Sequence, residues 1–87
     1  MYRLRFTAAA ERDVARLDPA VRRRILKRLE WLGRHAESFP HQALQGPLGD
    51  LFKFRVGDYR VLYDLARPES VIWIHRIEHR REVYQEK

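Results

Sequence analysis

Three cationic side chains, Lys53, Arg55 and Arg60, are spaced so that they could bind one anion. They belong to the run LFKFRVGDYRVLY at residues 51–63, which a Gly-Asp pair divides into two alternating halves. Gly-Asp is one of the two-residue loop types that β-hairpins favour, so the run predicts two antiparallel strands. In that register Arg55 lies directly opposite Arg60, an arrangement of like charges that destabilises a sheet. The cluster therefore indicates a site for a bound anion.

The alternation of side chains in the hairpin separates an apolar face from a charged face. We expect the apolar face to join the core, and it carries Phe52, Phe54, Val56, Tyr59, Val61 and Tyr63. The opposite face should remain an open sheet surface, and it carries Leu51, Lys53, Arg55, Arg60, Leu62 and Asp64. The C-terminal segment could bring further polar groups to this surface, namely His79, Arg80, Arg81 and Tyr84.

A cationic pocket without a metal suits the cleavage of RNA. RNA supplies its own nucleophile, the 2′-hydroxyl, so an enzyme must remove that proton, neutralise the phosphate and protonate the leaving 5′-oxygen. Lys53, which lies beside two arginines, could act as the base. Bidentate guanidinium groups could hold the phosphate, and the candidates are Arg55, Arg60 and Arg80.

The C-terminal segment offers two rings and one more cation for contact with RNA. Tyr84 or His79 could stack on an unpaired base or take part in proton transfer. A packing role for the ring of Tyr84 near the end of the chain is the alternative. Arg81 is a candidate for RNA binding together with Lys53 and Arg60.

The spacing of apolar residues predicts the elements that must position these groups. A strand is predicted over residues 2–6, a helix over 8–17 and a longer helix over 19–36, with Thr7 and Asp18 as N-caps. Residues 71–77 are apolar on both faces, which is typical of an inner strand, and residues 78–84 predict a short turn or helical segment.

The order of elements, β-α-α-β-β-β, predicts an α+β domain. Two N-terminal helices should pack on a small, mostly antiparallel, four-stranded sheet. Residues 37–50 hold two prolines and two glycines, so they predict a surface loop, pinned by Phe39, Leu44 and Leu48. His41 within this loop is expected to lie at the surface.

Length and composition bound the class of protein. The 87 residues make one domain, and the lack of cysteine excludes disulfides and thiolate chemistry. The net charge of +6 indicates an acidic partner, either nucleic acid or an acidic protein. We expect a soluble cytoplasmic protein without membrane contact, because no signal peptide or long apolar run is recognisable. Neither metal-ligand spacing nor a glycine-rich phosphate loop is present in the sequence, so no cofactor is expected.

The second predicted helix carries a basic outer face with Arg22, Arg23, Arg24, Lys27, Arg28 and Arg34. Such a face could contact a large polyanion through many diffuse cations. The interpretation that we favour is structural, because Lys and Arg commonly solvate an exposed helix and cover apolar surface with their stems.

The hairpin LFKFRVGDYRVLY, the aliphatic strand after it and the closing IEHRREVY together resemble the RelE branch of the RelE/ParE toxin superfamily. The opening YRLRFTAAAERDVARLDPAVRRRILKRLEWL is similar to that family's strand and helical hairpin, so the resemblance covers essentially the whole chain. These proteins are the toxins of type II toxin-antitoxin modules. The combination of RVGDYRVLY with HRREVY is specific at the level of the family.

The resemblance implies a microbial-RNase-like fold and a ribosome-dependent endoribonuclease. Such a toxin cleaves mRNA in the ribosomal A site without a metal and leaves a 2′,3′-cyclic phosphate. It also implies a cognate, RelB-like antitoxin that wraps the toxin and neutralises it. The antitoxin usually carries the DNA-binding part, so the toxin would reach operator DNA only through its partner.

Four residues of this chain match functional positions of the resembled family. Lys53 matches a lysine involved in proton transfer and phosphate contact, and Arg60 matches an arginine that binds phosphate. Arg80 matches an arginine proposed to assist the leaving group. Tyr84 matches the tyrosine that orients or stacks on the nucleotide.

Arg55 departs from the pattern of the resembled family, because the best-studied members have a second lysine there. Arginine keeps the charge but is a poor base. The general base would therefore be Lys53 or His79. His79 and Arg81 belong to a local pattern that varies among family members.

Two alternatives to an RNase remain open from the sequence. ParE members share the fold but poison DNA gyrase instead of cutting RNA, whereas Lys53, Arg60, Arg80 and Tyr84 favour the RNase branch. A catalytically weak toxin that acts mainly as an antitoxin-binding co-repressor is the other alternative, and Arg55 is compatible with low activity.

Overall fold

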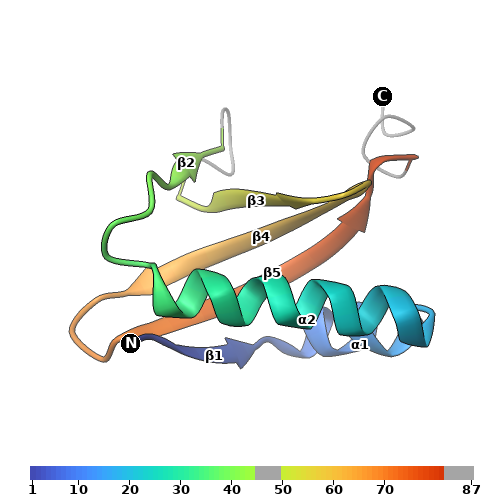
Figure 1. Cartoon of the computed structure of the whole chain (residues 1–87), viewed down its shortest axis with the longest axis horizontal. Helices are drawn as coiled ribbons and strands as arrows, with labels where there is room; N and C mark the ends of the chain where they lie inside the picture. Colours follow the sequence, from blue (N-terminus) through green and yellow to red (C-terminus); the bar gives the residue numbers. More distant parts are fainter. Residues whose placement is uncertain (45–49, 82–87) are drawn as a thin grey trace.

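The computed structural model describes residues 1–44 and 50–81 of the chain. In this part β1 (Arg3–Phe6) precedes two helices, α1 (Ala8–Arg16) and α2 (Pro19–Arg34), which lie on one side of a sheet (Figure 1). The remaining strands are β2 (Gln42–Ala43), β3 (Phe52–Val56), β4 (Tyr59–Ala66) and β5 (Val71–His79). None of the helices in the described ranges is long and apolar enough to cross a membrane.

The strands of the described residues form one five-stranded sheet in the order β1-β5-β4-β3-β2. β1 runs parallel to β5, and the other neighbours are antiparallel. The predicted α+β class, the mostly antiparallel sheet and the inner position of β5 are therefore confirmed. The sheet has one strand more than the four predicted, because the two-residue β2 pairs with β3 inside the segment predicted as a loop.

The helices begin where the sequence indicated. The Oγ1 of Thr7 accepts a hydrogen bond from the N–H of Ala10 at 3.2 Å, which caps α1 as predicted. Pro19 occupies the first turn of α2. Asp18 occupies the N-cap position of α2 as predicted, but its side chain makes no capping hydrogen bond in the described part of the chain.

The predicted register of the hairpin is confirmed. Phe54 lies opposite Val61, and Arg55 lies opposite Arg60. Gly57 in the loop has φ of +58°, the left-handed region that glycine adopts without strain. A Cβ at this position would also lie 3.0 Å from the guanidinium of Arg24.

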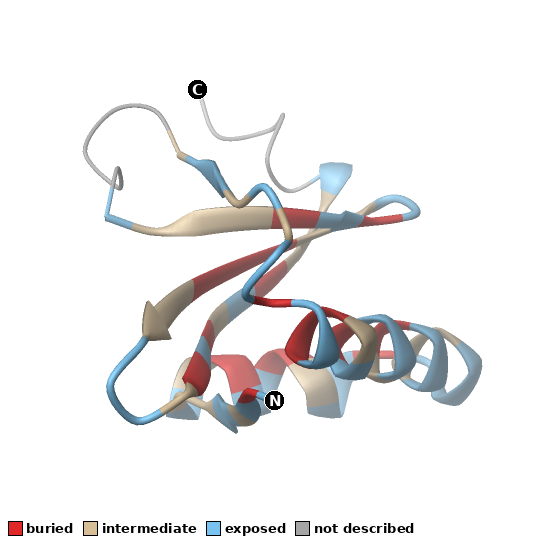
Figure 2. Cartoon of the chain, turned by 60° about the vertical axis from the view of Figure 1, so that its left-hand side comes forward, coloured by how far each residue is buried: buried red, intermediate tan, exposed pale blue. Residues whose placement is uncertain are grey.

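The core lies between the helices and the apolar face of the sheet. Figure 2 shows that the buried segments of the helices and strands face one another. The buried members from the hairpin are Phe54, Val56, Val61 and Tyr63, whereas Phe52 and Tyr59 are partly buried at its margin. Leu62 is also only 2% exposed, although the register puts it on the charged face beside Lys53.

Beyond the end of β1, polar side chains of Thr7 and of α1 form hydrogen bonds with the edge of β5. Thr7 donates from its Oγ1 to the carbonyl of His75 at 3.1 Å. Asp13, which is 6% exposed, accepts from the N–H of Ile77 and from the Nε of Arg76, both at 2.8 Å. These hydrogen bonds offset the cost of burying the Asp13 carboxylate. They also satisfy the backbone of β5 beyond β1, and β5 continues as a strand to His79.

Candidate functional site

A small cavity of about 80 Å³ lies on the charged face of the hairpin. It is lined by Lys53 and Arg55 from β3, Arg60 from β4 and Gln42 from β2. Lys53 lies opposite Gln42, and Arg55 lies opposite Arg60, so the sheet register puts all four side chains on one face. The structure therefore brings together the three cations that the sequence singled out.

Sequence reasoning missed Gln42. Its strand is only two residues long, which is too short to show an alternating pattern. β2 is continued by a backbone hydrogen bond from Leu44 N to the carbonyl of Leu51 at 2.9 Å. The side-chain amide of Gln42 supplies the cavity with an acceptor as well as donors, whereas Lys53 and the arginines are donors only.

Arg60 forms an ion pair with the carboxylate of Glu78, which the sequence analysis did not identify. Arg60 Nη2 donates to Glu78 Oε1 at 3.0 Å, and the two side chains are 30% and 18% exposed. Glu78 lies directly opposite Arg60 on β5, because that strand continues two residues past its predicted end at residue 77. Arg60 Nε is buried and has no hydrogen-bond partner among the described residues. Arg60 thus has one side-chain donor bound by a carboxylate and another without a partner.

Arg80 lies at the loop end of the hairpin. Its backbone N–H donates to the carbonyl of Asp58 at 2.8 Å, and its Nη1 lies 3.6 Å from Asp58 Oδ1. Both side chains are more than half exposed, so this ion pair contributes little to stability. Arg81 is exposed, and its backbone N–H donates to His79 Nδ1 at 3.1 Å.

His79 is not brought together with the three cations. It lies opposite Tyr59, and the two rings are in edge contact with centroids 4.9 Å apart. The alternation of β4 puts Tyr59 on the apolar face of the sheet, so His79 lies on that face as well. The prediction that His79 shares a surface with Lys53 is wrong, because β5 remains a strand through His79. Tyr84 lies outside the described residues.

His41 is partly buried, which corrects the prediction that it lies at the surface. Its Nε2 is 2.7 Å from the carbonyl of Ala36, and its Nδ1 is hydrogen-bonded to the hydroxyl of Tyr63. The carbonyl can only accept, so Nε2 donates to it, and in that tautomer the Tyr63 hydroxyl donates to Nδ1. Rings of Phe39 and Phe52 pack against the imidazole. His41 thereby fixes the chain immediately before Gln42.

Replacing Tyr63 with phenylalanine is expected to lower the free energy of unfolding by about 1 kcal/mol, because it removes the hydroxyl that donates to His41. Burial raises the pKa of the Tyr63 hydroxyl above its ordinary value of 10.0. The unfolded chain therefore loses this proton at a lower pH than the folded protein does. The Tyr63 hydroxyl therefore makes its full contribution to the free energy of unfolding below pH 10, and this contribution declines as the pH rises above 10.

Urea unfolding of wild type and Tyr63→Phe between pH 7 and pH 11 measures both effects. Tyr59→Phe is the matched control, because Tyr59 lies on the same face of the sheet but is less buried. The difference in free energy of unfolding between wild type and Tyr63→Phe should become smaller above pH 10. A gap that stayed constant at alkaline pH would contradict the burial of a protonated hydroxyl.

The basic face of α2 is partly used inside the protein. Arg22 donates to the carbonyls of Val14, Ala15 and Leu17 at the C-terminal end of α1. The guanidinium of Arg28 lies over the rings of Trp31 and Phe54, 4.8 and 5.5 Å from their centroids. These contacts support the structural interpretation of that face for Arg22 and Arg28.

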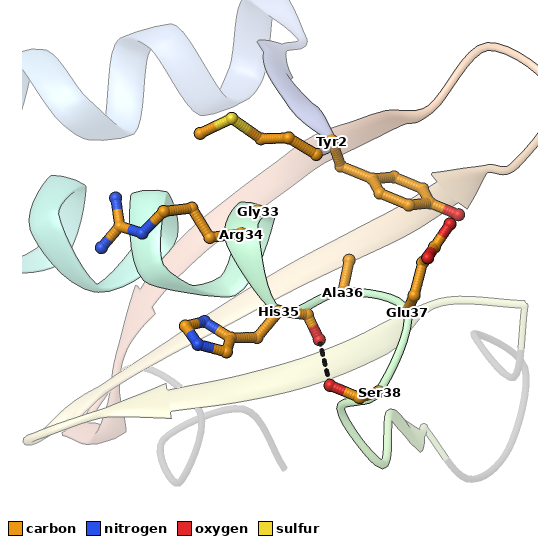
Figure 3. A pocket seen from close by; sticks show the side chains of 8 residues that line it. Tyr2, Gly33, Arg34, His35, Ala36, Glu37 and Ser38 are labelled. Atoms are coloured by element: carbon orange, nitrogen blue, oxygen red, sulfur yellow. Dashed lines mark hydrogen bonds between the residues drawn. The ribbon is translucent and has the colours of Figure 1, made fainter.

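A second cavity, of about 220 Å³, lies where α2 ends beside the start of the chain (Figure 3). Its lining includes Tyr2, Gly33, His35 and Ser38, and the Ser38 hydroxyl donates to the carbonyl of His35 at 3.4 Å. The N–H of Tyr2 donates to the carbonyl of Gly33 at 3.0 Å, and a Cβ on Gly33 would lie 2.8 Å from the carbonyl oxygen of Tyr2. This close backbone approach accounts for the glycine in α2, and the candidate catalytic residues that the structure describes do not line this cavity.

Comparison with known protein families gives one clear match. A family model described as the ParE toxin of the type II toxin-antitoxin system parDE matches residues 4–84. No curated protein sequence matches the chain.

Several solved structures have a similar fold. A chain of the RelBE2 toxin-antitoxin complex from Mycobacterium tuberculosis is 29% identical, with a TM-score of 0.79 over 90% of this chain and 96% of that one. A chain of the archaeal RelE-RelB complex from Pyrococcus horikoshii is 31% identical, with a TM-score of 0.68 over 91% and 94%. Isolated Escherichia coli RelE is 23% identical, with a TM-score of 0.76 over 99% and 94%. The predicted fold is thus confirmed.

Proposed function

This chain belongs to the RelE/ParE superfamily of type II toxins, and from that premise we propose that it is a RelE-like mRNA endoribonuclease. In this proposal it cleaves mRNA in the ribosomal A site and stops translation. The observation that carries the proposal is the cavity in which Lys53, Arg55 and Arg60 converge on one face of the hairpin.

The donors of this cavity suit a phosphodiester. Three cations can neutralise the phosphate and the additional negative charge that develops as the 2′-oxygen attacks phosphorus. The bond from phosphorus to the 5′-oxygen then breaks and that oxygen takes up a proton, which leaves a 2′,3′-cyclic phosphate on one fragment and a 5′-hydroxyl on the other. Lys53 accepts the proton of the 2′-hydroxyl, because Arg55 and Arg60 hold their protons too tightly to serve as bases.

The remaining roles come from the C-terminal segment. Arg80, which is exposed beside Asp58, is proposed to assist the leaving 5′-oxygen, and Tyr84 is proposed to stack on the nucleotide. Arg81 is exposed and adds a further contact to RNA. The position of His79 on the apolar face of the sheet gives no support to a role for it in proton transfer.

The proposed partners are the ribosome with its mRNA and a RelB-like antitoxin. The matched structures are a RelBE2 toxin-antitoxin complex from Mycobacterium tuberculosis and a RelE-RelB complex from Pyrococcus horikoshii. The net charge of +6 suits both an acidic antitoxin and RNA. Contact with operator DNA is proposed to pass through the antitoxin.

A second candidate function is inhibition of DNA gyrase without nuclease activity. The family model that matches residues 4–84 is described as a ParE toxin, which favours this alternative. The cationic cavity favours the RNase, because a protein that only binds gyrase has no need of converging phosphate ligands.

Induced expression without an antitoxin tests the choice between the two functions. We expect growth arrest within one generation, with a collapse of protein synthesis measured by amino-acid incorporation and with chromosomal DNA intact on a gel. Continued protein synthesis together with broken DNA would support the gyrase inhibitor and overturn the RNase.

A further inference from the structure

Arg60 is bound by an internal anion on the surface where the proposed substrate would bind. Arg55, Arg60 and Glu78 form one row across β3, β4 and β5, since Arg60 is directly opposite Arg55 on one side and Glu78 on the other. Glu78 Oε1 accepts from Arg60 Nη2 at 3.0 Å. One carboxylate therefore compensates the repulsion between two arginines.

A second nitrogen of the Arg60 guanidinium, Nε, has no hydrogen-bond partner among the described residues. This nitrogen is buried, although a buried donor is costly to leave unsatisfied. Bidentate recognition by arginine engages two N–H groups at once. The contact with Glu78 uses a single oxygen and a single nitrogen, so it is an incomplete version of the pairing that arginine makes with a carboxylate or phosphate.

We propose that Glu78 is a built-in competitor for the phosphate at Arg60. In the free protein its carboxylate occupies Arg60, and RNA must exchange a phosphate oxygen for it. Glu78 therefore sets how strongly the cavity binds an anion and disfavours small anions that reach few of the other cations. This inference rests on the proposed function, because it assigns the competing ligand to a phosphate of RNA.

The chain provides a matched control for the charge that Glu78→Gln removes. Asp58 also forms an ion pair with an arginine, Arg80, but these side chains are 63% and 64% exposed and their closest atoms are 3.6 Å apart. Asp58→Asn and Glu78→Gln change the net charge equally. Any difference between them therefore reports the position of Glu78 rather than general electrostatics.

The test is a titration of the full-length protein with inorganic phosphate at low ionic strength, followed by NMR on the backbone N–H groups of Lys53 and Arg55, which line the cavity in every variant. We expect Glu78→Gln to bind phosphate roughly fivefold tighter than wild type, and Asp58→Asn to gain less than twofold. In an Arg60→Ala background, the extra effect of Glu78→Gln should fall to the level of Asp58→Asn. Circular dichroism melting of each variant checks that the fold persists.

Equal gains for the two variants would overturn the proposal, because general electrostatics would then account for both. Weaker phosphate binding by Glu78→Gln would also overturn it, since Glu78 would then position Arg60 instead of competing for it. The readout needs no RNA cleavage. If the protein left mRNA intact but its variants showed the predicted phosphate affinities, the proposed nuclease function would be wrong and the role of Glu78 would still hold.

Discussion

Alanine at Lys53 or at Arg60 is expected to abolish growth arrest when the protein is expressed without an antitoxin. Each substitution removes a cation from the cavity of about 80 Å³ that is proposed to hold the scissile phosphate. Loss of one preorganised donor to a transition-state oxyanion typically costs about 10²- to 10³-fold in rate. For Lys53 the loss of general-base catalysis adds to this effect.

Matched controls come from the same chain. Lys27 and Arg23 are exposed on α2, so Lys27→Ala and Arg23→Ala make the same changes of charge away from the cavity. Both control variants should remain toxic. Colony counts after induction measure the effect, and co-purification with the antitoxin shows that each variant is folded. Full toxicity of both Lys53→Ala and Arg60→Ala would show that the cavity is not the active site.

The second prediction separates charge from proton transfer at two neighbouring positions. Lys53→Arg keeps the cation but replaces a group that can act as a base with one that cannot. We expect its cleavage rate to fall about 10²-fold or more, because general-base catalysis typically contributes that much. Arg55→Lys should keep at least the wild-type rate, since the best-studied members of the family that the chain resembles have lysine at this position.

Single-turnover cleavage of mRNA on programmed ribosomes, measured as a function of pH, is the appropriate assay. Arg55→Lys serves as the reciprocal control, because it makes the opposite exchange on the same strand. If Lys53→Arg cut mRNA as fast as wild type, Lys53 would contribute charge alone and the base would have to be another group.

The hairpin was predictable in detail because its signals are local. Gly57 supplies the positive φ that the two-residue loop requires, and alternation then fixes which side chains share a face. Local pattern alone therefore predicts that Lys53, Arg55 and Arg60 lie together.

The end of β5 was not predictable from local pattern. Glu78 and His79 remain in the strand, where α1 supports its edge through Asp13, a residue 64 positions before Ile77 in the sequence. That extension by two residues puts Glu78 beside Arg60 and His79 on the opposite face. A strand boundary predicted two residues too early thus misplaced His79 and missed the contact of Glu78 with Arg60.

The same limit applies to β2 and His41. Gln42 reaches the cavity because His41 is bound to the Tyr63 hydroxyl and the Ala36 carbonyl, and the Tyr63 partner lies 22 residues away. Neither the strand nor the histidine contact leaves a periodic signal in the sequence. Both depend on packing that only the folded chain provides.

The most direct test of the central proposal is the chemical analysis of mRNA ends. Purified protein is incubated with ribosomes that hold a defined mRNA, in parallel with the Lys53→Ala variant, and the new 3′ ends are characterised by mass spectrometry. We predict cuts within the A-site codon that end in a 2′,3′-cyclic phosphate for wild type, and none for Lys53→Ala. Intact mRNA with wild type, or identical cuts with Lys53→Ala, would contradict the account.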